Sequence, residues 1–350
     1  MAQQTFYVAR LNFLSGLHLA LDRDNNYDES DDRLRSDTLL SALYACALEL
    51  GLAESNDPSF MERYRLSSAF PFWQGEGGVP PVYFFPRPLD PQLAIDFEDN
   101  KTENRKKKGG IEYFDLPLFE DVIAGRKISL KDDNLSKNNR LASSQYITSL
   151  QILDNTPFQH VAIHDWEDKE PVPYYVDKLF FEEGCGLYFL IECAEDHVGD
   201  LQACLRLLAD NGIGTDRSSG NGAFDWTEED WGTLQLNVPD QADGRWMSLS
   251  LFIPETPADL GDLEQAAYEL TKRGGYIASS VAQDYTLMTI RKKSIMAFEE
   301  GSLLHTSVIP SGRIADLQPD KTALDEEKKK AMHPIWRSGR AIFIPTNLKL

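Results

Sequence analysis

The chain has 350 residues, a formal net charge of −21 and 42% hydrophobic residues. This length favours two domains, and the composition allows a sizeable core without disulfides or metals. No apolar run approaches the roughly 20 residues that cross a bilayer, and the first residues lack the pattern of a secretory signal. We therefore expect a soluble, cytoplasmic protein. The acidity, taken alone, argues against nucleic-acid binding, which normally recruits Lys and Arg.

The first 90 residues predict three strands around one strong helix. Thr5–Leu11 is rich in β-forming residues, as in an opening strand. Apolar residues at helical spacing predict a helix over Asp37–Leu50, and Gly51 follows its end. Two short strands, Leu66–Phe72 and Val82–Phe85, then flank a turn rich in Gly and Pro.

Residues 90–160 are polar and weakly periodic, and they contain the most basic run of the chain, Lys101–Lys108. We interpret the stretch at about 90–180 as an insertion that forms a protruding lobe, because its pattern does not predict a third domain.

A regular pattern resumes after the insertion. Leu187–Cys193 predicts a buried strand and Val198–Leu208 a helix, followed by a glycine-rich segment, residues 212–224. A further strand is predicted at Thr233–Val238.

The remaining residues repeat this order of elements. They predict a strand at Trp246–Ile253, a helix at Asp259–Leu270 and a final strand at Arg340–Pro345. Two successive rounds of strands and helices favour an α+β fold with mostly antiparallel sheets and helices on one face.

The glycine-rich segment is the most informative for function. Four glycines in eleven residues allow conformations in which successive backbone N–H groups point at one anion, and an arginine and two serines add phosphate donors. It is neither a P-loop nor a dinucleotide fingerprint, because it contains no Lys and follows a helix. A flexible helix-to-strand connection with a glycine cap is an equally open interpretation. The candidate RNA-binding residues are Gly212, Gly214, Arg217, Ser218, Ser219, Gly220, Asn221 and Gly222.

The basic run offers a second candidate contact with RNA or with a partner. Its central residues are Arg105, Lys106, Lys107 and Lys108. Most short charge runs are solvated loop tips, and that interpretation stays open here.

The sequence contains no pattern that predicts catalysis, a metal or a cofactor. The four cysteines form no Cys-x-x-Cys pair, and the six histidines form no His-Glu-x-x-His motif. A Gly-x-Ser-x-Gly nucleophile motif is also absent. We therefore expect no catalytic residues, no metal site and no cofactor.

Several segments, in this order, resemble the RAMP proteins, which are RRM-like subunits of CRISPR systems. The resemblance is strongest to the fourth-named subunit of the type III-A effector (Csm) complex, and residues 90–180 contribute little to it. The segments that carry it are Ser15–Ala20, Arg35–Leu43, Ser67–Phe72, Tyr83–Leu89, residues 212–224 and Gly339–Pro345.

This resemblance implies two ferredoxin-like (RRM-like) domains. The first spans residues 1–240, including the insertion and the glycine-rich segment, and the second spans residues 241–350. It also implies a non-catalytic scaffold in antiviral defence that binds the 5′ handle of the crRNA. The implied protein partners are the large polymerase/cyclase-type subunit and a backbone RAMP subunit.

The start of the predicted helix fits such a role. Ser36 and Thr38 offer hydroxyl groups beside a positive helix end, and Arg35 adds a cation. We expect His18, in the first resembling segment, to be structural or adjacent to RNA.

Two other functions stay open. A guide-RNA-processing endoribonuclease of the RAMP type would use His18 as a general base. Such nucleases carry their glycine-rich loop close to the C-terminus, whereas here 126 residues follow Phe224, which disfavours this function. An acidic adaptor that binds only protein is the other alternative.

Overall fold

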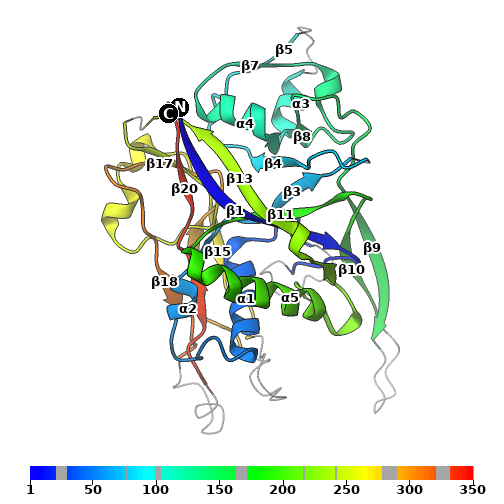
Figure 1. The fold of residues 1–350 in the computed structure, drawn as a ribbon, viewed down its shortest axis with the longest axis vertical. Coiled ribbons are helices and arrows are strands. Elements are labelled where there is room, and N and C mark those ends of the chain that lie inside the picture. The colour runs from blue at the N-terminus through cyan, green and yellow to red at the C-terminus, as the bar shows by residue number, and fades with distance from the viewer. Residues whose placement is uncertain are drawn as a thin grey trace.

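The computed structural model has a mixed α+β architecture around one large central sheet (Figure 1). It describes residues 1–20, 30–75, 77–98, 104–162, 172–215, 217–240, 243–277, 290–320 and 332–349.

The central sheet has nine strands, which are β1 (Ala2–Phe13), β2 (Arg65–Leu66), β3 (Phe70–Trp73), β4 (Val82–Pro86), β6 (Tyr113–Asp115), β8 (Leu141–Ala142), β11 (Cys185–Glu192), β12 (Phe224–Asp225) and β13 (Trp231–Val238). Their order is β12-β1-β11-β3-β4-β6-β8, with β13 also paired to β1 and β2 to β11. All neighbours are antiparallel except β6 and β8. The strands β13, β1, β11 and β3 therefore lie side by side.

Two helices cover one face of this sheet. They are α1 (Ser36–Glu49) and α5 (Val198–Asn211), and the short α2 (Ser59–Glu62) follows α1. Leu43 of α1 and Leu205 of α5 share a buried cluster with Phe189 of β11, which explains the apolar spacing of both helices. Among the described residues, no helix combines the length and the apolar composition needed to span a membrane.

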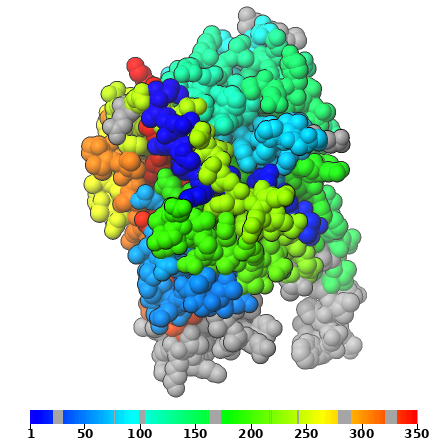
Figure 2. Space-filling model, in the orientation of Figure 1, coloured from blue at the N-terminus to red at the C-terminus, as the bar shows by residue number. Residues whose placement is uncertain are grey.

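The inserted residues cover the opposite face. They form β5 (Ile95–Phe97), α3 (Asn104–Gly110), α4 (Leu116–Ile123) and β7 (Ile128–Leu130), which make up the upper lobe in Figure 1. This lobe shares one buried core with Tyr188 and Leu190 of β11. The central strand is thus buried on both faces, which explains its continuous apolar sequence. Figure 2 shows β1 and β13 running across the surface between the lobe and the helical layer.

A long two-stranded ribbon leaves the sheet on the right of Figure 1. It consists of β9 (Leu153–Ala162) and β10 (Val172–Phe181), and we call it the N-terminal ribbon. An isolated bridge between Leu17 and Leu179 attaches it to the segment that follows β1. Residues expected to belong to a polar insertion thus form a regular β-structure.

The C-terminal residues form small sheets beside the central one. A three-stranded sheet joins β17 (Leu303–His305), β14 (Arg245–Ser248) and β20 (Phe343–Pro345). Its Met247 and Ile344 belong to the same buried core as the lobe. Two further pairs are β15 (Leu270–Arg273) with β16 (Ile295–Phe298), and β18 (Ile314–Asp316) with β19 (Trp336–Ser338).

The prediction of a helix at Asp259–Leu270 is wrong. This stretch contains two 3-10 turns, Pro257–Leu260 and Leu263–Gln265, before β15 begins. The cause is Gly261, which has a φ of 57° and lies so close to the neighbouring sheet that an added Cβ would be 2.0 Å from the carbonyl oxygen of His305. A helix cannot continue through that conformation.

Candidate nucleic-acid interface

The glycine-rich segment folds back against the residues that follow β1. Gly212, Gly214, Gly220 and Gly222 all have positive φ angles, between 71° and 102°. A Cβ on Gly222 would lie 1.8 Å from the carbonyl oxygen of Ile213. One on Gly214 would lie 2.6 Å from that of His18, whereas nothing lies within 4 Å at Gly220. Close backbone contact therefore requires glycine at positions 214 and 222.

Most of the amide groups expected to form an anion nest have partners inside the chain. The N–H of Ile213 donates to the carbonyl of Gly222, and that of Thr215 to the carbonyl of His18. Gly222 donates to Gly16, and Ala223 to the Ser15 hydroxyl. Gly220 donates to Arg217. These five amides are not available to a phosphate, so the segment is mainly a connector that holds two stretches of chain together.

The outward part of the segment is the 3-10 turn Arg217–Ser219 and the glycine that follows it. Arg217, Ser219 and Gly220 are exposed, whereas Asn221 is buried. The side chain of Ser218 lies outside the described part of the structure. Any contact of this segment with an anion therefore rests on the exposed turn.

His18 is buried where the glycine-rich segment meets the N-terminal ribbon, with 1% of its surface exposed. Its Nδ1 lies 2.7 Å from the carbonyl oxygen of Asp177, and because a carbonyl only accepts, Nδ1 donates this bond. Its Nε2 has no hydrogen-bond partner among the described residues. The backbone of His18 binds Thr215 at the same place, so this residue connects the ribbon to the glycine-rich segment.

The N-terminal ribbon carries exposed rings. Phe158 is 39% exposed and Tyr175 is 50% exposed. The ammonium group of Lys178 lies 5.0 Å from the centre of the Phe158 ring. These residues were not among those predicted to bind RNA, although aromatic residues in a polar stretch are a usable signal. The Phe158 ring beside this cation suits stacking with a nucleic-acid base, and Tyr175, which pairs with Gln159, presents a ring on the other face of the ribbon.

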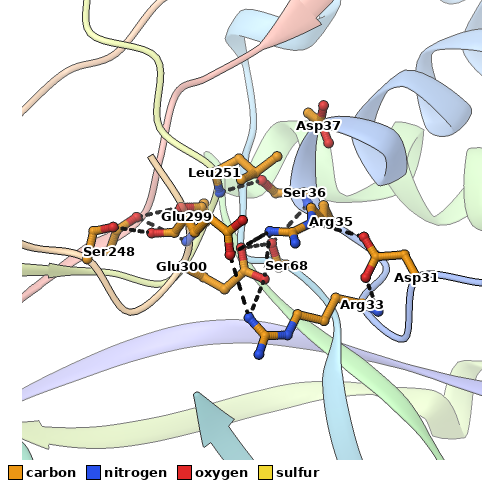
Figure 3. Close-up of polar contacts among 12 residues, drawn as sticks. Asp31, Arg33, Arg35, Ser36, Asp37, Ser68, Ser248, Leu251, Glu299 and Glu300 are labelled. Carbon is orange, nitrogen blue, oxygen red and sulfur yellow. Dashed lines mark hydrogen bonds and ion pairs between the residues drawn. The ribbon is translucent and has the colours of Figure 1, made fainter. Parts of the chain in front are cut away.

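The start of α1 has a different environment from the one expected. Arg35 is only 8% exposed, and its guanidinium forms ion pairs with Asp31 at 3.2 Å, Glu299 at 3.3 Å and Glu300 at 3.4 Å (Figure 3). The hydroxyl of Ser36 accepts from the N–H of Leu251. These side chains join α1 to the C-terminal residues instead of facing solvent.

Thr38 and its neighbour Asp37 bind a C-terminal arginine. Arg273 donates to both carboxylate oxygens of Asp37, at 2.9 and 3.1 Å, and to the Thr38 hydroxyl at 2.9 Å. Arg337 lies 3.4 Å from the same carboxylate. Burial raises the pKa of Asp37, but the two guanidinium groups outweigh it and lower the pKa to about 2. The expected RNA contacts of Arg35, Ser36 and Thr38 are therefore occupied within the chain.

The basic run forms α3 in the lobe. Lys107 pairs with Asp132, and Lys108 donates to the carbonyl of Leu93 at 2.7 Å. Arg105 and Lys106 are exposed, while Lys101 lies outside the described residues. Figure 1 places α3 in the upper lobe and α5, which leads into the glycine-rich segment, in the lower half, so the two candidate contacts are separate surfaces.

The described residues contain no cluster of three or more His, Cys, Asp or Glu side chains able to bind a metal ion. His18, the one histidine considered as a general base, is buried and already bonded through Nδ1. The geometry around it suits a structural role.

Sequence comparisons point to one family. Residues 241–346 match the family model of the CRISPR Csm4 C-terminal domain. The chain is 26% identical over 322 residues to CRISPR system Cms protein Csm4 of Mycobacterium tuberculosis, covering 92% of both chains. It is 28% identical over 311 residues to the protein of that name from Methanocaldococcus jannaschii, covering 77% of this chain and 80% of that protein.

Solved structures have the same fold. A chain in the Csm3-Csm4 subcomplex of the type III-A CRISPR-Cas interference complex matches with a TM-score of 0.59 at 18% identity, covering 99% of this chain and 100% of that one. A chain in the Csm1-Csm4 cassette in complex with AMPPNP matches with a TM-score of 0.57 at 17% identity, covering 99% of each. Residues 241–346 thus match the Csm4 C-terminal domain, and the chain as a whole is similar in sequence to Csm4 proteins and has the fold of chains in the Csm3-Csm4 and Csm1-Csm4 complexes.

Proposed function

We propose that the chain is a non-catalytic, RNA-binding scaffold subunit of a type III-A CRISPR effector complex. In this role it binds the 5′ handle of the crRNA and bridges the large polymerase/cyclase-type subunit to a backbone RAMP subunit. Its similarity to Csm4 proteins supports this, since chains with the same fold occur in complexes named Csm1-Csm4 and Csm3-Csm4. Such a complex acts in the cytoplasm, in antiviral defence.

The topology of the N-terminal part supports an RRM-like domain. The strand order β13-β1-β11-β3, with α1 and α5 on one face, is that of a ferredoxin-like βαββαβ unit, and the lobe and the N-terminal ribbon are inserted between β3 and β11. We therefore assign residues 1–240 to one such domain. The C-terminal residues 243–277, 290–320 and 332–349 contain no α-helix, so a second RRM-like domain at 241–350 stays a prediction.

The observation that carries the proposal is the connection between the ribbon and the glycine-rich segment. The ring of His18 donates to the backbone carbonyl of Asp177 in the ribbon. The backbone carbonyl of His18 accepts from the N–H of Thr215 in the glycine-rich segment. Exposed aromatic rings on the ribbon and the exposed turn of the segment thus belong to one continuous structure. Proteins bind single-stranded RNA by stacking its bases on aromatic side chains and contacting its backbone with cations and amides.

This arrangement would also let an acidic chain bind RNA. Stacking needs rings and not net charge, and Lys178 beside the Phe158 ring and the exposed Arg217 of the glycine-rich segment supply cations. We leave Arg35, Ser36 and Thr38 out of the RNA surface because their side chains bind other parts of the chain. His18 is assigned to positioning and not to catalysis.

The test is RNA binding by a ribbon variant. We expect Phe158→Ser with Tyr175→Ser to weaken binding of a fluorescent repeat-derived RNA, since each lost base stack costs about 1–3 kcal/mol, or about 5- to 150-fold. Anisotropy titrations of the full chain and of the purified complex measure this. The matched control is Tyr146→Ser, because Tyr146 is 72% exposed on the lobe.

Equal binding by the ribbon variant and the control would contradict the proposal. A purified complex that contains no RNA, judged by its absorbance at 260 and 280 nm, would favour the acidic adaptor instead. Metal-free cleavage of repeat RNA that disappears in His18→Ala would favour the endoribonuclease. Gly222→Ala is not a useful test, because a Cβ there disrupts the segment whatever it binds.

A further inference from the structure

The C-terminal part contains a second ribbon with one exposed face. It consists of β15 and β16 and continues through a bridge between Tyr276 and Arg291, and we call it the C-terminal ribbon. Its inner face packs on the start of α1, where Arg273 binds Asp37, and Ala297 is fully buried. Because side chains alternate along a strand, Leu270, Lys272 and Met296 point to the opposite, outer face of the ribbon.

The outer face presents apolar side chains to solvent. Leu270 is 48% exposed and Met296 is 50% exposed, and Tyr268 packs on the Phe298 ring at a centroid distance of 5.0 Å. Lys272 pairs across the ribbon with Met296 and is exposed between these apolar groups. The face therefore combines apolar surface with a cation at its centre.

An exposed cation–π pair lies further along the ribbon. The Arg291 guanidinium lies 5.0 Å from the centre of the Tyr276 ring, which is 51% exposed. The described residues of the ribbon, 268–277 and 290–298, contain a single carboxylate, Glu269, although the whole chain carries −21. Their basic residues are Lys272, Arg273, Arg291, Lys292 and Lys293.

We propose that the exposed face of the C-terminal ribbon is a second contact surface for single-stranded RNA. The rings and apolar side chains would stack with bases, while Lys272 and Lys293 would contact phosphates. This inference rests on the proposed function of the chain. It extends that function to a surface formed entirely by C-terminal residues.

Charge favours RNA over a protein as the occupant. The centres of protein–protein interfaces are depleted of lysine, whereas Lys272 lies in the middle of this face. A local excess of cations in an acidic chain is complementary to a polyanion. The aromatic ring paired with a guanidinium is also a stacking platform for a base of any identity.

The test compares RNA binding by charge and ring variants of the full chain. Lys272→Gln with Lys293→Gln should weaken binding of a labelled single-stranded RNA about tenfold. It should also reduce the slope of log K against log salt by about 1.4, or about 0.7 for each lost phosphate contact. Tyr276→Leu should weaken binding about fivefold or more, with an unchanged slope.

A matched control removes two lysines from the lobe. Lys127→Gln with Lys131→Gln changes side chains that are 64% and 50% exposed and pair with acidic residues, and it should bind RNA as the unmodified chain does. Thermal unfolding midpoints equal to that of the unmodified chain would show that the variants are folded.

Three results would overturn the inference, and they differ in what they say of the proposed function. Unchanged affinity and salt slope in both C-terminal variants, with weak binding by Phe158→Ser/Tyr175→Ser, would refute the second surface alone. Absence of RNA binding by the unmodified chain and its complex would refute both proposals. C-terminal variants that keep their RNA affinity but lose a partner subunit from the purified complex would reveal a protein interface instead.

Discussion

Arginines of the C-terminal part have opposite surroundings at the start of α1 and at the outer end of the C-terminal ribbon. Arg273 and Arg337 face the carboxylate of Asp37, which is 1% exposed, whereas Arg291 lies over a half-exposed tyrosine ring. A buried pair must be satisfied inside the protein, because removing one partner leaves an uncompensated charge. An exposed cation over a ring remains accessible to a ligand. The contrast separates arginines that hold the fold together from one that is presented at the surface.

The largest effect should come from breaking the buried pair. Asp37→Asn removes the buried carboxylate that both guanidinium groups face, so we expect a loss of about 3–5 kcal/mol in the free energy of unfolding. Urea denaturation followed by tryptophan fluorescence measures it.

The control is Asp121→Asn, which removes an exposed pair with Arg126 in the lobe. Exposed pairs contribute about 0–1 kcal/mol, so this variant should unfold close to the unmodified chain. If the two variants lose similar stability, the contrast between buried and exposed charges is wrong.

Acid should remove a smaller part of the same stabilisation. The pKa of Asp37 falls from its usual 3.8 to about 2 on folding, so its contribution is complete above pH 4 and disappears as the pH falls through about 2. The shift corresponds to about 2 kcal/mol. Denaturation midpoints of the unmodified chain and Asp37→Asn should converge between pH 7 and pH 2.5, and a constant gap would argue against this role of Asp37.

The smallest effect is expected at the exposed cation–π pair. Arg291→Gln should cost about 0.5–1 kcal/mol of stability, the range for such pairs at exposed sites. The same urea titration checks it. A loss as large as that of Asp37→Asn would mean that the outer face of the ribbon is structural and not available to RNA.

Periodic elements could be predicted closely from the sequence. The helix expected at Asp37–Leu50 is α1, and the strand expected at Leu187–Cys193 is β11, each within two residues. Both bury apolar side chains with a clear period, so pattern alone determines them. The helix expected at Asp259–Leu270 failed because the conformation of Gly261 depends on a neighbouring strand.

The candidate site was less predictable because it depends on distant partners. Arg35 and Thr38 looked like solvent-facing donors until Glu300 and Arg273, more than 230 positions away, were seen beside them. The N-terminal ribbon was missed for a related reason. Its exposed positions carry aromatic rings and lysines, so its sequence lacks the alternation of apolar and polar residues that marks a half-buried strand.

The separation of 236 positions between Asp37 and Arg273 also has a consequence for synthesis of the chain. A ribosome adds about 5–20 residues each second, so the helix carrying Asp37 emerges roughly 12–47 s before the arginine that neutralises it. During that interval the nascent N-terminal part contains a carboxylate that cannot yet be buried. Burial of the Asp37 carboxylate in its final form must therefore wait until Arg273 has been synthesised.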